Sequence, residues 1–300
     1  MRRITMRAEV LEALSKLPHE LSQALKPMMT APGFDASLSP EEFQHLMAVS
    51  QLSDAELRIQ LLSIAAAYSI ASISNFYVGA IARGTSGRLY FGANMEFEST
   101  SMSQTVHAEQ SAISHAWLKG EEGISDITVN YSPCGHCRQF MNELSTAQSL
   151  VVQLPERTPK ALQEYLPESF GPTDLGITDL LLSDKTHDLQ LDSEDALLTA
   201  ACQAADKSHA PYSKNFAGVA LRAKDGRIFS GMYAENAAFN PSLPPLQVAM
   251  IHMNMADYPL SEITEAALVE QKSAPVSLLA DTQTTLETFS PDLQLAYAAI

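Results

Sequence analysis

The sequence predicts an α/β protein built on a mixed sheet, with two copies of one unit behind an N-terminal helical segment. The chain has 300 residues, about twice the 150 or so that are typical of one domain. Strand patterns alternate with helical patterns after a hairpin, as in α/β layer folds. A stretch of the first half also recurs in register in the second half, and such internal similarity indicates duplication.

Residues 1–51 are predicted to form a helical appendage. Apolar residues between Val10 and Leu17 fall at helical spacing. Pro18 suits the first turn of a second helix, and Ser39 followed by Pro40 supplies a cap and a first-turn proline for a third. We expect this segment to be appended to the domain that follows.

Residues 52–155 are predicted to form the first domain. A helix over residues 55–69 precedes strands at residues 77–82 and 88–92, which a Ser86-Gly87 turn joins into a hairpin. Helix and strand patterns then alternate: a helix over residues 110–118, a strand over residues 127–131, a helix from Pro133 onward and a buried strand over residues 150–154. This order predicts a mixed sheet covered by helices.

The internal repeat indicates that a second domain copies the first. Residues 79–88 correspond to residues 218–227, which lie 139 positions later. At the same offset further residues coincide, Gly92 with Gly231 and Glu96 with Glu235. Several prolines mark residues 156–191 as a connecting segment. The second domain is therefore expected to span residues 192–300.

The charge balance and the apolar pattern argue against several classes of partner. Lys and Arg number 19 against 35 Asp and Glu, a formal net charge of −16, whereas nucleic-acid binders usually present a basic surface to phosphates. No stretch approaches the roughly 18 apolar residues of a membrane span. The basic first residues are not followed by the apolar core of a signal peptide. We therefore expect a cytoplasmic protein with no nucleic-acid and no membrane partner.

Two short motifs in the first domain predict a catalytic zinc site. His107, Cys134 and Cys137 together supply three of the four ligands that tetrahedral zinc takes, which leaves the fourth position for water. Glu109 follows the histidine by two residues and could take a proton from that water. Each motif alone has an ordinary explanation, such as a helix cap or a pair of buried thiols. Their combination is typical of a catalytic site.

The local pattern around the cysteines predicts their environment. Pro133 suits the first position of a helix, so both thiols would lie near a helix N-terminus, which stabilises thiolate. Cysteines three positions apart share one face of a helix. His136 is therefore expected to point away from that face.

These motifs resemble those of a known family. An H-x-E motif followed by P-C-x-x-C is typical of zinc deaminases that act on nucleobases. Further matches run from about residue 52 to about residue 246 and include residues 74–80, 92–96 and 230–239. The chain resembles the cytidine deaminases that act on free nucleosides, in particular their long, two-domain bacterial form. The resemblance implies a duplicated three-layer α/β/α fold with a mixed sheet, and a homodimer.

The resemblance also implies roles for single residues. It implies that one Zn²⁺ per chain is held in the first domain by His107, Cys134 and Cys137, and that Glu109 shuttles protons. It implies that the nucleoside contacts Phe76 through ring stacking, Asn94 and Glu96 through ribose hydrogen bonds, and also Met95 and Ala108. It implies that the partner chain contributes Phe170 and Ala237. Ser132 stands where many relatives have threonine, and either residue supplies a hydroxyl.

The implied reaction is hydrolytic deamination of cytidine and 2′-deoxycytidine to uridine and 2′-deoxyuridine, with release of ammonia, in pyrimidine salvage. Hydroxide generated at the zinc would attack C4 of the pyrimidine. Glu109 would carry protons to N3 and then to the amino group. The carboxylate of Glu96 would repel a phosphate attached to the ribose, so polymers are expected to be poor substrates.

The second copy is predicted to lack this chemistry. At the offset of the repeat, His107-Ala108-Glu109 meets Leu246-Gln247-Val248, which includes no ligand and no base. No cysteine pair follows, because Cys202 stands alone upstream. We expect this domain to pack against the first one and to complete the pocket of the neighbouring chain.

Three other interpretations use the same residues. The zinc core also serves deaminases that act on a base in RNA or DNA. The sequence from Cys134 to Cys137, C-G-H-C, is also a dithiol oxidoreductase motif. A structural zinc would need a fourth protein ligand, for which His115 and His136 are the nearest candidates.

Overall fold

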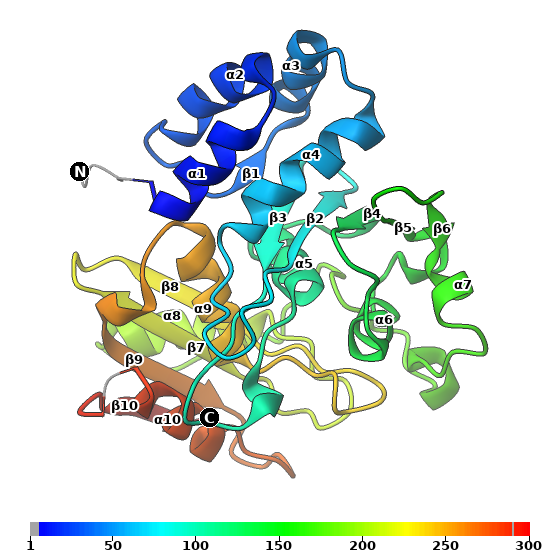
Figure 1. Cartoon of the computed structure of the whole chain (residues 1–300). Coiled ribbons are helices and arrows are strands. Elements are labelled where there is room, and N and C mark those ends of the chain that lie inside the picture. The colour runs from blue at the N-terminus through cyan, green and yellow to red at the C-terminus, as the bar shows by residue number, and fades with distance from the viewer. Residues whose placement is uncertain (1–5, 290) are drawn as a thin grey trace.

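Two mixed sheets form the centre of the computed structural model, which describes residues 6–289 and 291–300 (Figure 1). The first sheet has the order β1-β3-β2-β4-β5-β6 and contains β1 (Ser37–Leu38), β2 (Gly79–Gly84), β3 (Leu89–Ala93), β4 (Ile124–Val129), β5 (Val151–Gln153) and β6 (Lys160–Ala161). The second has the order β10-β9-β7-β8 and contains β7 (Gly218–Ala223), β8 (Ile228–Met232), β9 (Ile263–Glu270) and β10 (Leu295–Ala299). The first sheet has one parallel pair, β4 with β5, and the second has one, β9 with β10. Antiparallel pairs adjoin each of them. The predicted mixed sheet is therefore confirmed in both copies.

Helices cover both faces of the first sheet, and two glycines allow them to approach closely. A Cβ added at Gly79 would lie 2.5 Å from the backbone of α4 (Asp54–Ala66), and one added at Gly92 would lie 2.1 Å from the backbone of α5 (Ala108–Leu118). Gly92 pairs with Ala80, the neighbour of Gly79 along β2, so the two glycines face opposite sides of the sheet. The predicted three-layer α/β/α arrangement follows directly from this alternation.

The second copy repeats the design of the first. α8 (Ala196–Asp206) lies against Gly218, α9 (Pro245–Met255) lies against Gly231, and α10 (Leu279–Glu287) stands between β9 and β10 in the chain. α9 also packs against α5, so the two copies meet along these helices. Residues of α9 are buried almost all round, as expected of a helix enclosed between two domains.

The N-terminal segment forms the predicted helices and also a short strand. Its helices are α1 (Ala8–Lys16), α2 (His19–Met29) and α3 (Pro40–Ser50). The Ser39 hydroxyl accepts the N–H of Glu42, and the Glu42 carboxylate accepts the N–H of Ser39, which closes a capping box at the start of α3. β1 pairs with β3 and thereby extends the first sheet.

Residues 156–191, which the sequence predicts to be a connecting segment, pack in part on the first sheet. β6 pairs with β5 at the edge of the first sheet, and α7 (Leu162–Tyr165) follows it. Further on, the backbone of Leu181 exchanges hydrogen bonds with the backbones of Glu143 and Ser145. Among the helices of the described residues, none is both long enough and apolar enough to cross a membrane.

Candidate metal centre and substrate cavity

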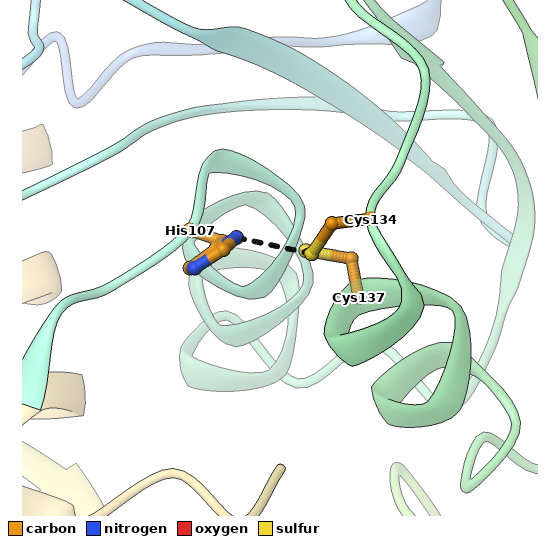
Figure 2. A group of neighbouring side chains, drawn as sticks. All are labelled: His107, Cys134 and Cys137. Atoms are coloured by element: carbon orange, nitrogen blue, oxygen red, sulfur yellow. Dashed lines mark hydrogen bonds between the residues drawn. The ribbon is translucent and has the colours of Figure 1, made fainter. Parts of the chain in front are cut away.

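The three predicted metal ligands meet where α5 and α6 (Gly135–Met141) begin (Figure 2). His107 is the N-cap of α5, Cys134 is the N-cap of α6, and Cys137 lies in the first turn of α6. The Nδ1 atom of His107 lies 3.5 Å from the Sγ atom of Cys134, and the two sulfurs are 3.7 Å apart. The helix begins two residues later than expected, at Gly135 rather than Pro133, but both thiols remain at its start.

These distances fit a tetrahedral zinc ion. With Zn–S bonds of about 2.3 Å and Zn–N bonds of about 2.0 Å, the edges of a tetrahedron are about 3.8 Å between sulfurs and about 3.5 Å between sulfur and nitrogen. The observed 3.7 Å and 3.5 Å agree with both edges. Within the described ranges, this is the single group of three or more His, Cys, Asp or Glu residues with ligand atoms close enough to share a metal.

The thiol pair is polarised by its own hydrogen bonds. A hydrogen bond from the Cys137 thiol, aided by others from His107 and the Cys137 N–H, lowers the pKa of Cys134 to about 3. The same thiol–thiol contact together with burial raises the pKa of Cys137. The Cys134 sulfur in turn raises the pKa of His107. Zinc takes thiolate and neutral imidazole, so binding would release the protons that remain.

Glu109 lies in the first turn of α5, beside the ligands. It is 4% exposed, and burial raises the pKa of its carboxyl. The Glu109 N–H and the neighbouring Cys137 thiol oppose this rise in pKa. An acid whose pKa is shifted toward neutrality suits repeated uptake and release of a proton.

A cavity of about 240 Å³ leads to the metal ligands. It is lined by Phe76, Val78, Asn94, Glu96, Thr105, Val106, His107, Ala108, Glu109, Tyr131, Ser132 and Cys134. Seven of these lining residues are among the site residues predicted from the sequence: Phe76, Asn94, Glu96, His107, Ala108, Glu109 and Cys134. Met95 is fully buried and is not among the lining residues, so its contact with substrate stays a prediction.

Tyr131 is the main lining residue that sequence reasoning missed. Its ring centroid lies 4.5 Å from that of Phe76, and both rings are about half exposed. The strand pattern extended to residue 131, whereas β4 ends at Val129, so Tyr131 lies in a bend after the strand. Its position just before the cysteine motif was the signal that could have identified it.

The two predicted ribose ligands are held by the loop that carries Phe76. The Asn94 Oδ1 accepts the N–H of Val78 at 2.9 Å, and its Nδ2 donates to the carbonyl oxygen of Phe76 at 2.9 Å. Glu96 accepts the N–H groups of Ile73 and Ser74, each at 2.9 Å, and also the Ser74 hydroxyl. Burial opposes ionisation of Glu96, but these hydrogen bonds hold its pKa below the usual range.

The two histidines considered as a fourth ligand lie outside the metal group. The His136 ring stacks on His107 with 5.1 Å between centroids, which corrects the expectation that it points away. His115 is buried, and its Nδ1 lies 2.9 Å from the carbonyl oxygen of Phe91. Neither belongs to the group formed by His107, Cys134 and Cys137.

The structure corrects the register of the repeat in the second copy. An added Cβ at Gly92 would meet Ala108 and Ala112, whereas one at Gly231 would meet Pro245 and Ala249. His107-Ala108-Glu109 therefore corresponds to Pro244-Pro245-Leu246, and not to Leu246-Gln247-Val248, because the loop before α9 is two residues shorter. The corrected positions also hold no ligand and no base.

Phe170 and Ala237, predicted to act on the partner chain, lie near each other beside α6. Neither lines the cavity of its own chain. The Gln139 Nε2 donates to the carbonyl oxygen of Phe170 at 2.9 Å and to the Oδ1 of Asn236 at 3.4 Å. Phe170 is 47% exposed, while Ala237 is buried and its N–H donates to the Glu143 carboxylate.

Comparison with known proteins agrees with this site. Residues 53–153 and 162–283 match two family models with the same description, the cytidine and deoxycytidylate deaminase zinc-binding region. The chain is 63% identical to a curated cytidine deaminase of Photobacterium profundum, over 98% of this chain and 100% of that one. It is 59% identical to one of Aliivibrio fischeri over 100% of both chains. A crystal structure of cytidine deaminase from Mycobacterium tuberculosis is similar at 28% identity over 40% of this chain and 99% of that chain, with a TM-score of 0.37.

Proposed function

The chain belongs to the cytidine and deoxycytidylate deaminase family, and on that premise we propose which residues carry its reaction. It is a zinc-dependent hydrolase that deaminates cytidine. The observation that carries the assignment is the convergence of His107, Cys134 and Cys137 with the buried Glu109 at one cavity, in a chain 63% identical to a named cytidine deaminase.

We propose that His107, Cys134 and Cys137 hold one zinc ion and that Glu109 moves the protons. Bound there, zinc supplies Lewis-acid activation of water for attack at C4 of the pyrimidine. Glu109 would take one proton from that water and deliver it to N3 as the oxygen adds to C4. It would then take the second proton from the hydroxyl at C4 and pass it to the amino group. The C4–N bond would break, ammonia would leave and uridine, with C4=O and a proton on N3, would remain. The burial and raised pKa of Glu109 support this role.

Substrate binding is assigned to the walls of the cavity. Phe76 and Tyr131 line the cavity with adjacent rings, on which the pyrimidine would stack. Asn94 and Glu96 line the same cavity and are proposed to bind the ribose hydroxyls. Ala108 lines the same cavity, and the buried Met95 stands between Asn94 and Glu96 in the chain. The reaction is expected to extend to 2′-deoxycytidine.

The competing interpretations are not favoured. A deaminase of RNA or DNA must accept phosphates, whereas the cavity presents the carboxylate of Glu96 and the chain carries a net charge of −16. A dithiol oxidoreductase would use Cys134 and Cys137 alone, yet His107 completes a zinc-like geometry with them.

The protein is further proposed to act as a homodimer in pyrimidine salvage. Phe170 is half exposed beside the segment that carries Ala237, so its ring is available to the cavity of a second copy. Ala237 is buried within its own chain, and its contribution to the partner's cavity stays a prediction. Two metal-binding thiols that must stay reduced also suit the cytoplasm.

The assignment is tested by following the ultraviolet absorbance of cytidine with the zinc-loaded chain. We expect turnover that a chelator abolishes and that added Zn²⁺ restores. Absence of cytidine turnover by the zinc-loaded chain would refute the function.

A further inference from the structure

Two glutamines connect the copies in a reciprocal arrangement. Gln110 of α5 donates from Nε2 to the carbonyl oxygen of Pro241 at 3.3 Å, across the boundary between the copies. Gln247 of α9 donates from Nε2 to the Gln104 carbonyl oxygen at 3.5 Å and to the Gln104 side chain. In the corrected register Gln110 corresponds to Gln247, and Gln104 to Pro241. Each helix thus holds the loop that precedes the other helix.

The two glutamines also differ in the partner of their side-chain oxygen. The Gln110 Oε1 accepts the N–H of His107 at 3.2 Å, as the second half of a helix cap. The residue equivalent to His107 is Pro244, which has no N–H. The Gln247 Oε1 is accordingly buried without a hydrogen-bond partner. Gln247 therefore does not cap the start of its own helix, α9, as Gln110 caps α5. It does hold Gln104 of the first copy.

The segment from Gln104 to His107 forms part of the wall of the substrate cavity. Thr105, Val106 and His107 all line it, and Val106 is anchored by backbone hydrogen bonds to Met95. Just before this segment, Met102 is 77% exposed. Gln104 itself is 7% exposed, and its side chain accepts a hydrogen bond from Gln247 of the second copy. Gln247 thus fixes Gln104, at the end of this wall segment that is farther along the chain from the metal ligand His107.

We propose that Gln110 and Gln247 are positioning residues for the zinc site, through which the metal-free copy holds the segment that carries His107. Gln110 joins the backbone of the metal ligand directly to the second copy. Gln247 fixes the same segment three residues upstream of the ligand. The inference rests on the proposed function, because it concerns the geometry of that reaction.

The main test is Gln247→Leu, which keeps the volume and removes the donor. Groups that orient a metal ligand typically contribute 10- to 100-fold to metal affinity or activity. We expect zinc loss to a competing chelator to be about tenfold faster, and kcat for cytidine to fall by about tenfold while KM changes less than twofold.

Asn254→Leu is the matched control. Asn254 lies on the same helix, is 0% exposed and donates one buried hydrogen bond, 3.0 Å long, to the Tyr68 carbonyl oxygen of the first copy. Its Oδ1, like the Gln247 Oε1, is buried without a partner. This variant should lose stability without a change in zinc release or in kcat, since its contact lies outside the segment from Gln104 to His107.

Gln104→Leu supplies a second variant on the loop side of the contact. Added to Gln247→Leu, it should change little further, because Gln247→Leu already removes the contact with the Gln104 side chain. Wild-type zinc release and kcat in both single variants, or an equal effect in Asn254→Leu, would overturn the positioning role. A wild-type chain that does not deaminate cytidine would instead refute the function on which the inference rests.

Discussion

Glu96 and Glu235 occupy equivalent positions in the two copies and accept equivalent hydrogen bonds. Glu96 accepts the N–H groups of Ile73 and Ser74, each at 2.9 Å. Glu235 accepts those of Tyr212 and Ser213 at 2.9 Å and 3.1 Å. Each carboxylate also accepts the hydroxyl of its serine. Because the second copy has no metal group among its described residues, holding this loop is a structural role that both carboxylates share.

Variants of Glu96 and Glu235 can distinguish a role in substrate binding from a role in holding the loop. Glu96→Gln and Glu235→Gln should each lower the free energy of unfolding to a similar extent, because each weakens the same hydrogen bonds. Only Glu96→Gln should raise KM for cytidine, by about 10- to 100-fold, the value of one hydrogen bond to a charged group. Urea unfolding and steady-state kinetics measure the two effects. Equal KM values for both variants would show that Glu96 does not contact the ribose.

Glu109→Gln tests the proton shuttle. The amide preserves the size of the buried side chain but cannot take or release the proton, so kcat should fall by at least 10²- to 10⁴-fold. Zinc content by elemental analysis should stay at one ion per chain, because Glu109 is not counted among the ligands. The exposed Glu122 provides the control Glu122→Gln, which should behave as wild type. Full activity in Glu109→Gln would remove Glu109 from the mechanism.

The three cysteines should divide into two metal ligands and one buried thiol. Cys137→Ser is expected to abolish stoichiometric zinc and activity, since zinc binds thiolate far better than a neutral hydroxyl. Cys202→Ser changes a buried thiol of α8 and should retain both. Thiol titration of the wild type in denaturant and in native buffer provides a second check. A zinc-free chain with two reactive thiols would instead favour the dithiol interpretation.

The buried histidines predict acid sensitivity. Burial lowers the pKa of His115 to about 4 from its ordinary 6.5, against the raising effects of the Phe91 carbonyl and Asp35. The unfolded chain therefore binds more protons than the folded chain between pH 6.5 and pH 4, so the free energy of unfolding falls as the pH falls through this window. His252 in the second copy, with its pKa also lowered to about 4 by burial, acts in the same direction.

His115→Gln isolates this contribution. The amide cannot titrate but can still donate to the Phe91 carbonyl oxygen. The loss in urea midpoint between pH 7 and pH 5 should be smaller than in wild type, whereas His19→Gln, at an exposed position, should leave that loss unchanged. An unchanged pH dependence in His115→Gln would show that His115 is not neutral in the fold.

The features that could be predicted from the sequence are encoded in short local motifs. The features that could not be predicted depend on contacts between residues far apart in the chain. His107, Cys134 and Cys137 could be identified as candidate ligands from the sequence, because they belong to two short motifs typical of zinc sites. Each motif lies at the start of a helix. The contact between Gln247 and Gln104 joins residues 143 positions apart. The spacing of residues within a motif cannot predict such a contact. The repeat predicted the hairpins correctly, yet it misplaced the start of α9, because a loop shortened by two residues shifts every later position while the hairpin still aligns.

Mixed dimers provide the sharpest test of the predicted partner contribution. If Phe170 acts on the neighbouring cavity, Phe170→Ala impairs the site of the other chain, whereas Glu109→Gln inactivates the site of its own chain. In a dimer of one variant with the other, the chain that carries Phe170→Ala keeps its own Glu109 and receives an intact Phe170 from its partner. That single site should be active, so a fully exchanged equimolar mixture should recover about a quarter of the wild-type activity. Each variant alone should show much less, and mixing without subunit exchange should recover nothing. If Phe170 instead acts within its own chain, every site in the mixed dimer carries one lesion, and exchange restores no activity.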